Sequence, residues 1–137
     1  MKCLSLKQPY ADLLVFGEKT IELRKWNTKF RGEFLIHASK NIDISACERL
    51  KMDIDKLTIG AIIGSAFLYD FKEYNNQEEF NKDKQKHFSI VTKYFEGYKY
   101  GFLIKNARKF KKSIPYPGKL RFFEVDNSLL VILNPTT

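Results

Sequence analysis

The segment Glu18-Lys-Thr-Ile-Glu-Leu-Arg-Lys-Trp26 predicts a short strand whose polar face is loaded with charge. Alternate residues of a strand point to opposite faces, so Glu22, Arg24 and Trp26 share one face and the aliphatic residues share the other. These side chains suit a site for a flat polar ring, with Trp26 stacking, Glu22 accepting a hydrogen bond, and Arg24 with Lys19 meeting a phosphate. A cross-strand ion-pair ladder, with Trp26 closing the core, is the alternative interpretation.

Helix and turn signals flank this strand. Pro9 suits the first position of a helix over residues 9–16, and Gly17 suits the left-handed residue that ends it. Further helices are predicted near 43–52 and 77–95, the last one broken. Many short strands beside few helices indicate a mainly β, α+β chain, in which a small barrel has helices over its ends. Strands are predicted near residues 2–6, 19–26, 33–38, 59–72, 99–105, 120–125 and 128–133.

Several motifs, in this order, resemble those of the ASCH family, the activating-signal-cointegrator homology domains. They are S-L-x-Q-P-x-A from Ser5, G-x-K-x-x-E-x-R from Gly17 and R-G-x-x-x-I-H-A from Arg31. Later stretches, at residues 60–66 and 100–120, also resemble the family, so the likeness runs from Cys3 to about Val125. The resemblance implies a single PUA-like β-barrel with a few covering helices, related to folds that bind RNA or a modified base. It also implies a cleft at the barrel mouth, edged by Lys7, Gln8, Lys19, Glu22, Arg24 and Trp26.

The chain has the length and composition of one domain, with 137 residues of which 44% are hydrophobic. We predict a single domain over residues 1–137, with residues 134–137 as a frayed tail. No apolar run approaches the roughly 18 residues of a membrane helix. Gln8, Pro9 and Asp12 interrupt any signal peptide. These features predict a cytoplasmic protein without a membrane partner.

The cysteines and histidines do not form a recognisable metal motif. Cys3 is predicted in a strand and Cys47 on a helix, and neither belongs to a C-x-x-C pair, so buried free thiols are expected. His37 lies in the strand predicted at 33–38, where a hydrogen-bonded structural role is expected. Because no ligand spacing such as H-x-x-x-H occurs, we predict neither a metal nor another cofactor.

The net charge is concentrated in one segment. Residues Lys99–Arg121 contain eight basic side chains and no acidic one, whereas the rest of the chain holds 16 of each, so this segment carries the whole net charge of +8. Aromatic residues are interleaved with the cations, which suits a phosphate backbone with accessible bases. A solvated lysine-rich loop that keeps the protein soluble is the alternative. The predicted phosphate contacts are Lys105, Arg108, Lys109, Lys111, Lys112, Lys119 and Arg121.

A binding function fits these residues. The chain would be an RNA or single-stranded nucleic-acid binding module, in which the basic segment follows the phosphates and the cleft holds one base, modified or not. Glu22 would accept a hydrogen bond from an amino edge of that base, and Trp26 would stack on it. RNA, single-stranded DNA and a free nucleoside all suit the same cleft, and the sequence leaves the oligomeric state open. A protein-interaction module is a further alternative.

An enzymatic function is implied by the resemblance. One bacterial branch of the ASCH family is an amidohydrolase that deacetylates acetylcytidine, using a lysine and a threonine on this strand and a distant glutamate. The lysine corresponds to Lys19, but Glu22 stands where that branch has its threonine, and Glu78 or Glu79 lies in about the region of the distant glutamate. Lys19 and Glu22 are the catalytic candidates of this alternative. The carboxylate could activate water, yet it also favours the charged form of the lysine.

Overall fold

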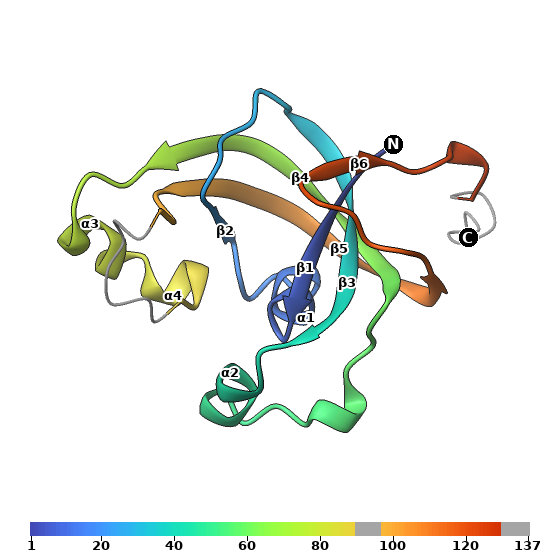
Figure 1. The fold of residues 1–137 in the computed structure, drawn as a ribbon. Helices are drawn as coiled ribbons and strands as arrows, with labels where there is room; N and C mark the ends of the chain where they lie inside the picture. Colours follow the sequence, from blue (N-terminus) through green and yellow to red (C-terminus); the bar gives the residue numbers. More distant parts are fainter. Residues whose placement is uncertain (90–96, 130–137) are drawn as a thin grey trace.

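Within residues 1–89 and 97–129, which a computed structural model describes, the chain forms one mixed sheet of six strands (Figure 1). Neighbouring strands follow the order β2-β5-β4-β3-β1-β6. β1 runs parallel to β3, and the other neighbouring pairs are antiparallel. The prediction of a mainly β, α+β chain is therefore confirmed. The strands are β1 (Lys2–Gln8), β2 (Ile21–Arg24), β3 (Gly32–Ile42), β4 (Ala61–Glu73), β5 (Tyr100–Pro115) and β6 (Phe122–Glu124).

The closed barrel is not confirmed, because the sheet keeps two free ends. Among the described strands, no pairing joins β2 to β6. Side chains bridge this opening instead. Trp26, just after β2, packs edge-on against Phe122 of β6 with ring centroids 6.0 Å apart. Arg24 of β2 donates a hydrogen bond of 2.9 Å to the Ser5 carbonyl of β1, one residue beyond the pairing of β1 with β6.

Short helices connect and cover the strands. α1, which the sequence predicts over 9–16, buries Ala11, Leu13 and Leu14 and contacts β1, β3, β4 and β5. The Asp43 side chain begins α2 by accepting the Ala46 N–H at 3.0 Å. The helices whose bounds both lie in the described part are α1 (Tyr10–Val15), α2 (Ile44–Arg49), the 3₁₀ turn η1 (Ile54–Lys56), α3 (Gln77–Lys82) and α4 (Lys84–His87).

The main core lies between the sheet and α1. A Cβ atom on Gly64 of β4 would overlap the Arg108 carbonyl of β5 and the side chain of Val15 in α1. Glycine is therefore required where these three elements meet, and the register of β4 against β5 shifts at the same residue. The core side chains include Leu4, Leu6, Leu14, Phe34, Ile36, Leu68, Phe102 and Ile104.

Some predicted elements differ from the observed ones. β5 runs to Pro115 instead of ending near residue 105, so most of the basic segment lies on a strand. The broken helix predicted at 77–95 is seen as α3 and α4, while residues 90–96 lie outside the described part. The strand predicted at 128–133 is wrong at its start, because residues 127–129 form a helical turn. Residues 130–137, which include the predicted tail, also lie outside the described part.

The cysteines and His37 have the structural settings that the sequence predicts. Both cysteines are buried free thiols, and burial raises the pKa of Cys3 to about 12. His37 Nε2 lies 2.6 Å from the Tyr116 carbonyl and His37 Nδ1 lies 2.8 Å from the Ser5 hydroxyl. Among the described side chains, no group of three or more His, Cys, Asp or Glu residues could hold a metal ion. None of the described helices is long and apolar enough to cross a membrane.

Candidate functional site

A cavity of about 430 Å³, called the cleft below, lies between β1 and β2. Its walls come from β1, the start of α1, β2, the end of β3 and the segment after β5. The volume is in the range of about 300–1,000 Å³ that is usual for small-molecule sites. The cleft brings together six of the charged residues that the sequence singles out, namely Lys7, Lys19, Glu22, Arg24, Lys119 and Arg121.

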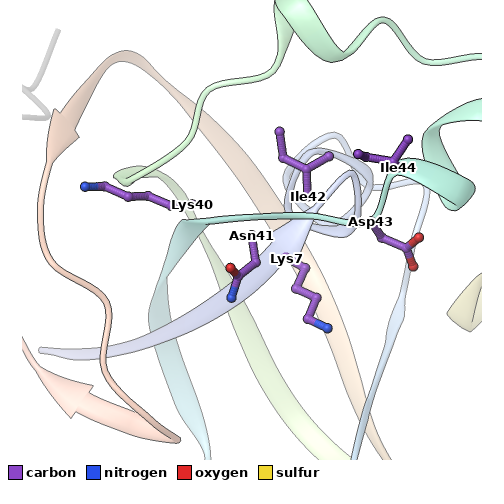
Figure 2. Close-up of a pocket in the computed structure, with 6 residues that line it drawn as sticks. All are labelled: Lys7, Lys40, Asn41, Ile42, Asp43 and Ile44. Atoms are coloured by element: carbon purple, nitrogen blue, oxygen red, sulfur yellow. The ribbon is translucent and has the colours of Figure 1, made fainter.

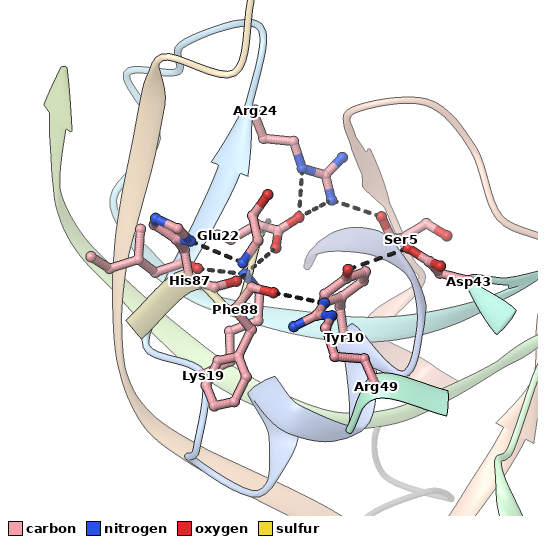
Figure 3. A network of polar contacts seen from close by, with 11 residues as sticks. Ser5, Tyr10, Lys19, Glu22, Arg24, Asp43, Arg49, His87 and Phe88 are labelled. Carbon is pink, nitrogen blue, oxygen red and sulfur yellow. Dashed lines mark hydrogen bonds and ion pairs between the residues drawn. The ribbon is translucent and has the colours of Figure 1, made fainter. Parts of the chain in front are cut away.

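Lys19 lies in the cleft wall with its ammonium hydrogens engaged (Figure 3). Gly17, whose φ is +80°, turns the chain out of α1 toward this position. Lys19 Nζ lies 2.6 Å from the Ile21 carbonyl, 2.8 Å from the His87 carbonyl and 3.2 Å from Glu22 Oε1. An ammonium group has three N–H donors, so these acceptors use all of them. The side chain is 3% exposed, and this burial lowers the pKa of Lys19 while the Glu22 carboxylate opposes the change.

Glu22 connects the buried lysine to an arginine at the edge of the cleft. Glu22 Oε2 accepts a 2.9 Å hydrogen bond from Arg24 Nε and lies 2.8 Å from Arg24 Nη2. Arg24 Nη2 also donates to the Ser5 carbonyl, so the guanidinium is held from two sides (Figure 3). A guanidinium held in one orientation suits planar recognition of an anion. The two aliphatic residues of β2 pack into a core cluster with Tyr74 and Phe80, as strand alternation predicts.

Two tyrosines that the sequence analysis did not assign to the cleft supply ring surface there. The Tyr10 hydroxyl donates to Asp43 Oδ2 at 3.3 Å, and burial together with the Asp43 charge raises the pKa of Tyr10 to about 12. Tyr98, just before β5, is half-buried, and Lys25 Nζ lies 4.8 Å from its ring centroid. No sequence signal marks Tyr10, because six-residue α1 is too short to show which of its sides meets a cleft.

His87 lines the cleft as a neutral ring. Its Nδ1 accepts the Ser89 N–H at 3.0 Å, and its Nε2 donates to the Phe80 carbonyl at 2.8 Å. A backbone N–H can only donate and a carbonyl can only accept, so these two contacts determine the tautomer. Burial lowers the pKa of His87. The ring therefore fixes the end of α4. The backbone carbonyl of His87, the last residue of that helix, accepts a hydrogen bond from Lys19.

Two predicted cleft residues lie outside the cleft lining. Gln8 is fully buried, and its Nε2 donates at 2.8 Å both to Asp12 Oδ1 and to the Thr58 carbonyl. Trp26 packs edge-on against Phe102, with ring centroids 5.3 Å apart, as well as against β6. Gln8 is thus engaged in hydrogen bonds and Trp26 in ring packing, because each sits where separate elements meet.

The remaining predicted phosphate contacts lie along β5, outside the cleft. They are exposed, and beyond Ile104 the described pairings of β5 involve β4 on one side alone. Lysines on such an edge also discourage pairing with other strands. The basic segment is therefore divided between the cleft, which has Lys119 and Arg121, and the strand, which has Lys105, Arg108, Lys109, Lys111 and Lys112.

A second cavity, of about 540 Å³, adjoins the cleft (Figure 2). Lys7, Asn41 and Asp43 line both cavities. Lys7 and Asn41 point to one side of the chain in Figure 2, whereas Ile42 points to the other. Lys40 also lines the second cavity, so it has two lysines in its wall.

The glutamates considered for the distant catalytic position lie on α3. Glu78 is exposed, and Glu79 Oε2 accepts the Asn75 N–H at 3.0 Å. Neither residue lines the cleft. The carboxylate that contacts Lys19 is Glu22.

Comparisons with known proteins agree with the sequence motifs. The family model of the ASCH domain matches residues 4–113. The chain is 27% identical over 140 residues to Activating signal cointegrator 1 of Mus musculus and 26% identical to that of Homo sapiens. Each match covers 93% of this chain and 22% of the relative, so the chain spans about a fifth of the length of these relatives.

Solved structures show the same fold. The ASCH protein of Zymomonas mobilis matches with a TM-score of 0.69 and 16% identity, over 96% of this chain and 94% of that one. A serine-to-alanine variant of that protein matches with a TM-score of 0.70 and 17% identity, over the same shares of the two chains. The family match covers most of the chain, and the structural likeness extends over almost all of it. The chain therefore belongs to the ASCH domain family.

Proposed function

We propose that this ASCH domain binds RNA or another single-stranded nucleic acid and holds one nucleotide in the cleft. The arrangement of charge carries the proposal. Lys7, Lys119 and Arg121 are exposed cleft residues, and Arg24 is held beside them by the buried Glu22. Cations at an opening suit phosphate, and a carboxylate behind them suits the amino edge of a base.

The geometry supports a role for each group. The Arg24 guanidinium is already fixed by Glu22 and Ser5, so little side-chain freedom is lost when it meets a phosphate. Tyr98 and Tyr10 provide the ring surface for stacking, in place of Trp26. The lysines of β5 contact flanking phosphates outside the cleft.

Binding of a 12-nucleotide, end-labelled single-stranded RNA tests the cleft through fluorescence anisotropy at several salt concentrations. Affinity should fall as salt rises, with a slope of log K against log salt of about −2 to −4, because each neutralised phosphate contributes about −0.7. The double variant Lys7→Glu and Lys119→Glu should bind at least about tenfold more weakly and show a flatter slope.

The matched control changes two exposed lysines outside the cleft, with Lys29→Glu and Lys56→Glu. It alters the net charge equally, so it should retain most of the affinity. Equal losses in the two double variants, or no RNA binding by the wild type, would reject the cleft as the binding site.

A hydrolase acting on acetylcytidine is the second candidate, favoured by the 3.2 Å contact between Lys19 and Glu22 at the cleft. A general base needs a free lone pair, whereas this ammonium donates to three acceptors. We therefore assign Lys19 a structural role and expect no acetate release from acetylcytidine. Acetate release by the wild type that drops by about a hundred- to ten-thousand-fold in a folded Lys19→Ala variant would make the chain an enzyme.

A further inference from the structure

The outer face of the sheet, turned away from α1, has an aromatic pair beside the basic strand. Phe34 and Ile36 of β3 pack in the core with α1, so Leu35 between them faces the other side of the sheet, where a second core cluster buries it. Directly opposed residues of neighbouring strands share a face. The register therefore places Glu33, Phe67 and Lys105 in one row across β3, β4 and β5 on this outer face. The neighbouring row consists of Leu35, Ser65 and Arg108, of which Arg108 alone is exposed.

Tyr69 belongs to the same surface. Lys105 Nζ lies 5.6 Å from the ring centroid of Phe67 and 5.0 Å from that of Tyr69, so one ammonium group contacts both rings. Tyr69 is 45% exposed, and its ring takes no part in the core clusters of the described residues. Tyr69 and Lys105 are exposed and Phe67 is half-buried, so ring surface and a cation meet solvent on one face.

We propose that Phe67 and Tyr69 form a stacking surface for the bases of a single-stranded nucleic acid, with Lys105 and Arg108 on its phosphates. This surface rests on the proposed nucleic-acid function and adds a contact region separate from the cleft. Residues two apart in a strand are about 7 Å from each other, which leaves room for one base on each ring. Aromatic rings accept any base, because every base has a π-face.

The charges on the two sides of the rings orient the bound strand. Lys105 and Arg108 lie on the β5 side, whereas Glu33 lies on the β3 side and repels phosphate. Bases would therefore lie over β4 with the phosphates over β5. On binding, the Lys105 ammonium group exchanges its ring contacts for a phosphate, since its long side chain is exposed. This charge pattern favours nucleic acid over a protein partner as the occupant.

The experiment uses the full chain with the same labelled 12-nucleotide RNA, and with labelled cytidine monophosphate as a probe of the cleft alone. Tyr69→Ala should weaken RNA binding at least about fivefold with an unchanged salt slope, because stacking is not ionic. Lys105→Gln should reduce the magnitude of the slope by about 0.7. Tyr69→Phe keeps the ring and should bind as the wild type does. Neither Tyr69→Ala nor Lys105→Gln should alter the binding of cytidine monophosphate.

Phe16→Ala is the matched control, because Phe16 is 57% exposed at the end of α1. Thermal melting of each variant verifies that the fold is kept. RNA binding by Tyr69→Ala and Lys105→Gln equal to that of the wild type would overturn the stacking surface while leaving the cleft proposal intact. A wild type that binds no RNA would overturn both the stacking surface and the cleft proposal. The same holds if the wild type binds an acidic peptide, in a manner that depends on Tyr69, and binds no RNA.

Discussion

At the scale of single residues, Glu22 is the group that holds the cleft together. It contacts both Lys19 and Arg24, and its side chain is 10% exposed. Removing one partner of a buried ion pair leaves an uncompensated charge, which costs about 3–5 kcal/mol. Glu22→Gln should therefore lower the free energy of unfolding by about that amount, as measured by urea denaturation.

Glu124→Gln is the matched control for this prediction. Glu124 pairs with Lys2 and with the N-terminal amine at the surface, where its side chain is 65% exposed. Surface pairs contribute little to stability, because water screens them. This variant should unfold at the same urea concentration as the wild type. If Glu22→Gln and Glu124→Gln lower the free energy of unfolding by the same amount, the burial of Glu22 does not make its ion pairs more important for stability.

At the scale of elements, β5 should govern the long-range attraction of nucleic acid. Lys109, Lys111 and Lys112 are exposed on this strand, outside the cleft. Changing all three to Glu should weaken binding of the 12-nucleotide RNA and reduce the magnitude of its salt slope by up to about 2, at about 0.7 per lost phosphate contact. Anisotropy titrations at several salt concentrations measure both quantities.

The control for β5 replaces three exposed lysines elsewhere, with Lys29→Glu, Lys56→Glu and Lys84→Glu. The net charge changes equally, but none of these three lysines lies on a strand. A salt slope that is the same for the β5 variant and the wild type would show that these β5 lysines do not contact RNA phosphates.

At the scale of the whole molecule, two buried histidines make stability depend on pH. Burial lowers the pKa of both His37 and His87 below the ordinary value of about 6.5. Above that value both rings are neutral in the folded and unfolded chain, so stability is full. As the pH falls below it, the unfolded chain binds protons that the folded chain does not, and stability falls until the folded pKa is reached.

The melting temperature should therefore be lower at pH 5.5 than at pH 7.5. In the double variant His37→Gln and His87→Gln the difference between the two pH values should shrink, even where the variant is less stable throughout. The pKa of Asp83 is held low by Lys72 and Tyr74 despite burial, so protonation of Asp83 lowers the stability further only in more acidic solution. A melting temperature that stays constant or rises on acidification would contradict the assignment of neutral histidines.

Local physical rules made several features predictable from the sequence. The two faces of β2 follow from strand periodicity, because successive side chains must alternate. The end of α1 follows from Gly17, which adopts a positive φ without a steric penalty. The family follows from the order of its motifs, and the buried free cysteines follow from their spacing and predicted elements.

The sequence by itself determined which residues carry the charge of this protein, and only the tertiary structure decided where that charge acts. Lys119 reaches the same cleft as Lys19 because the chain returns past β1 after β5, a long-range arrangement that no local pattern encodes. Trp26 packs with Phe102 and Phe122 because the ends of the open sheet meet there. Alternation tells which residues share a face of a strand, whereas pairing and packing between distant segments determine what that face meets.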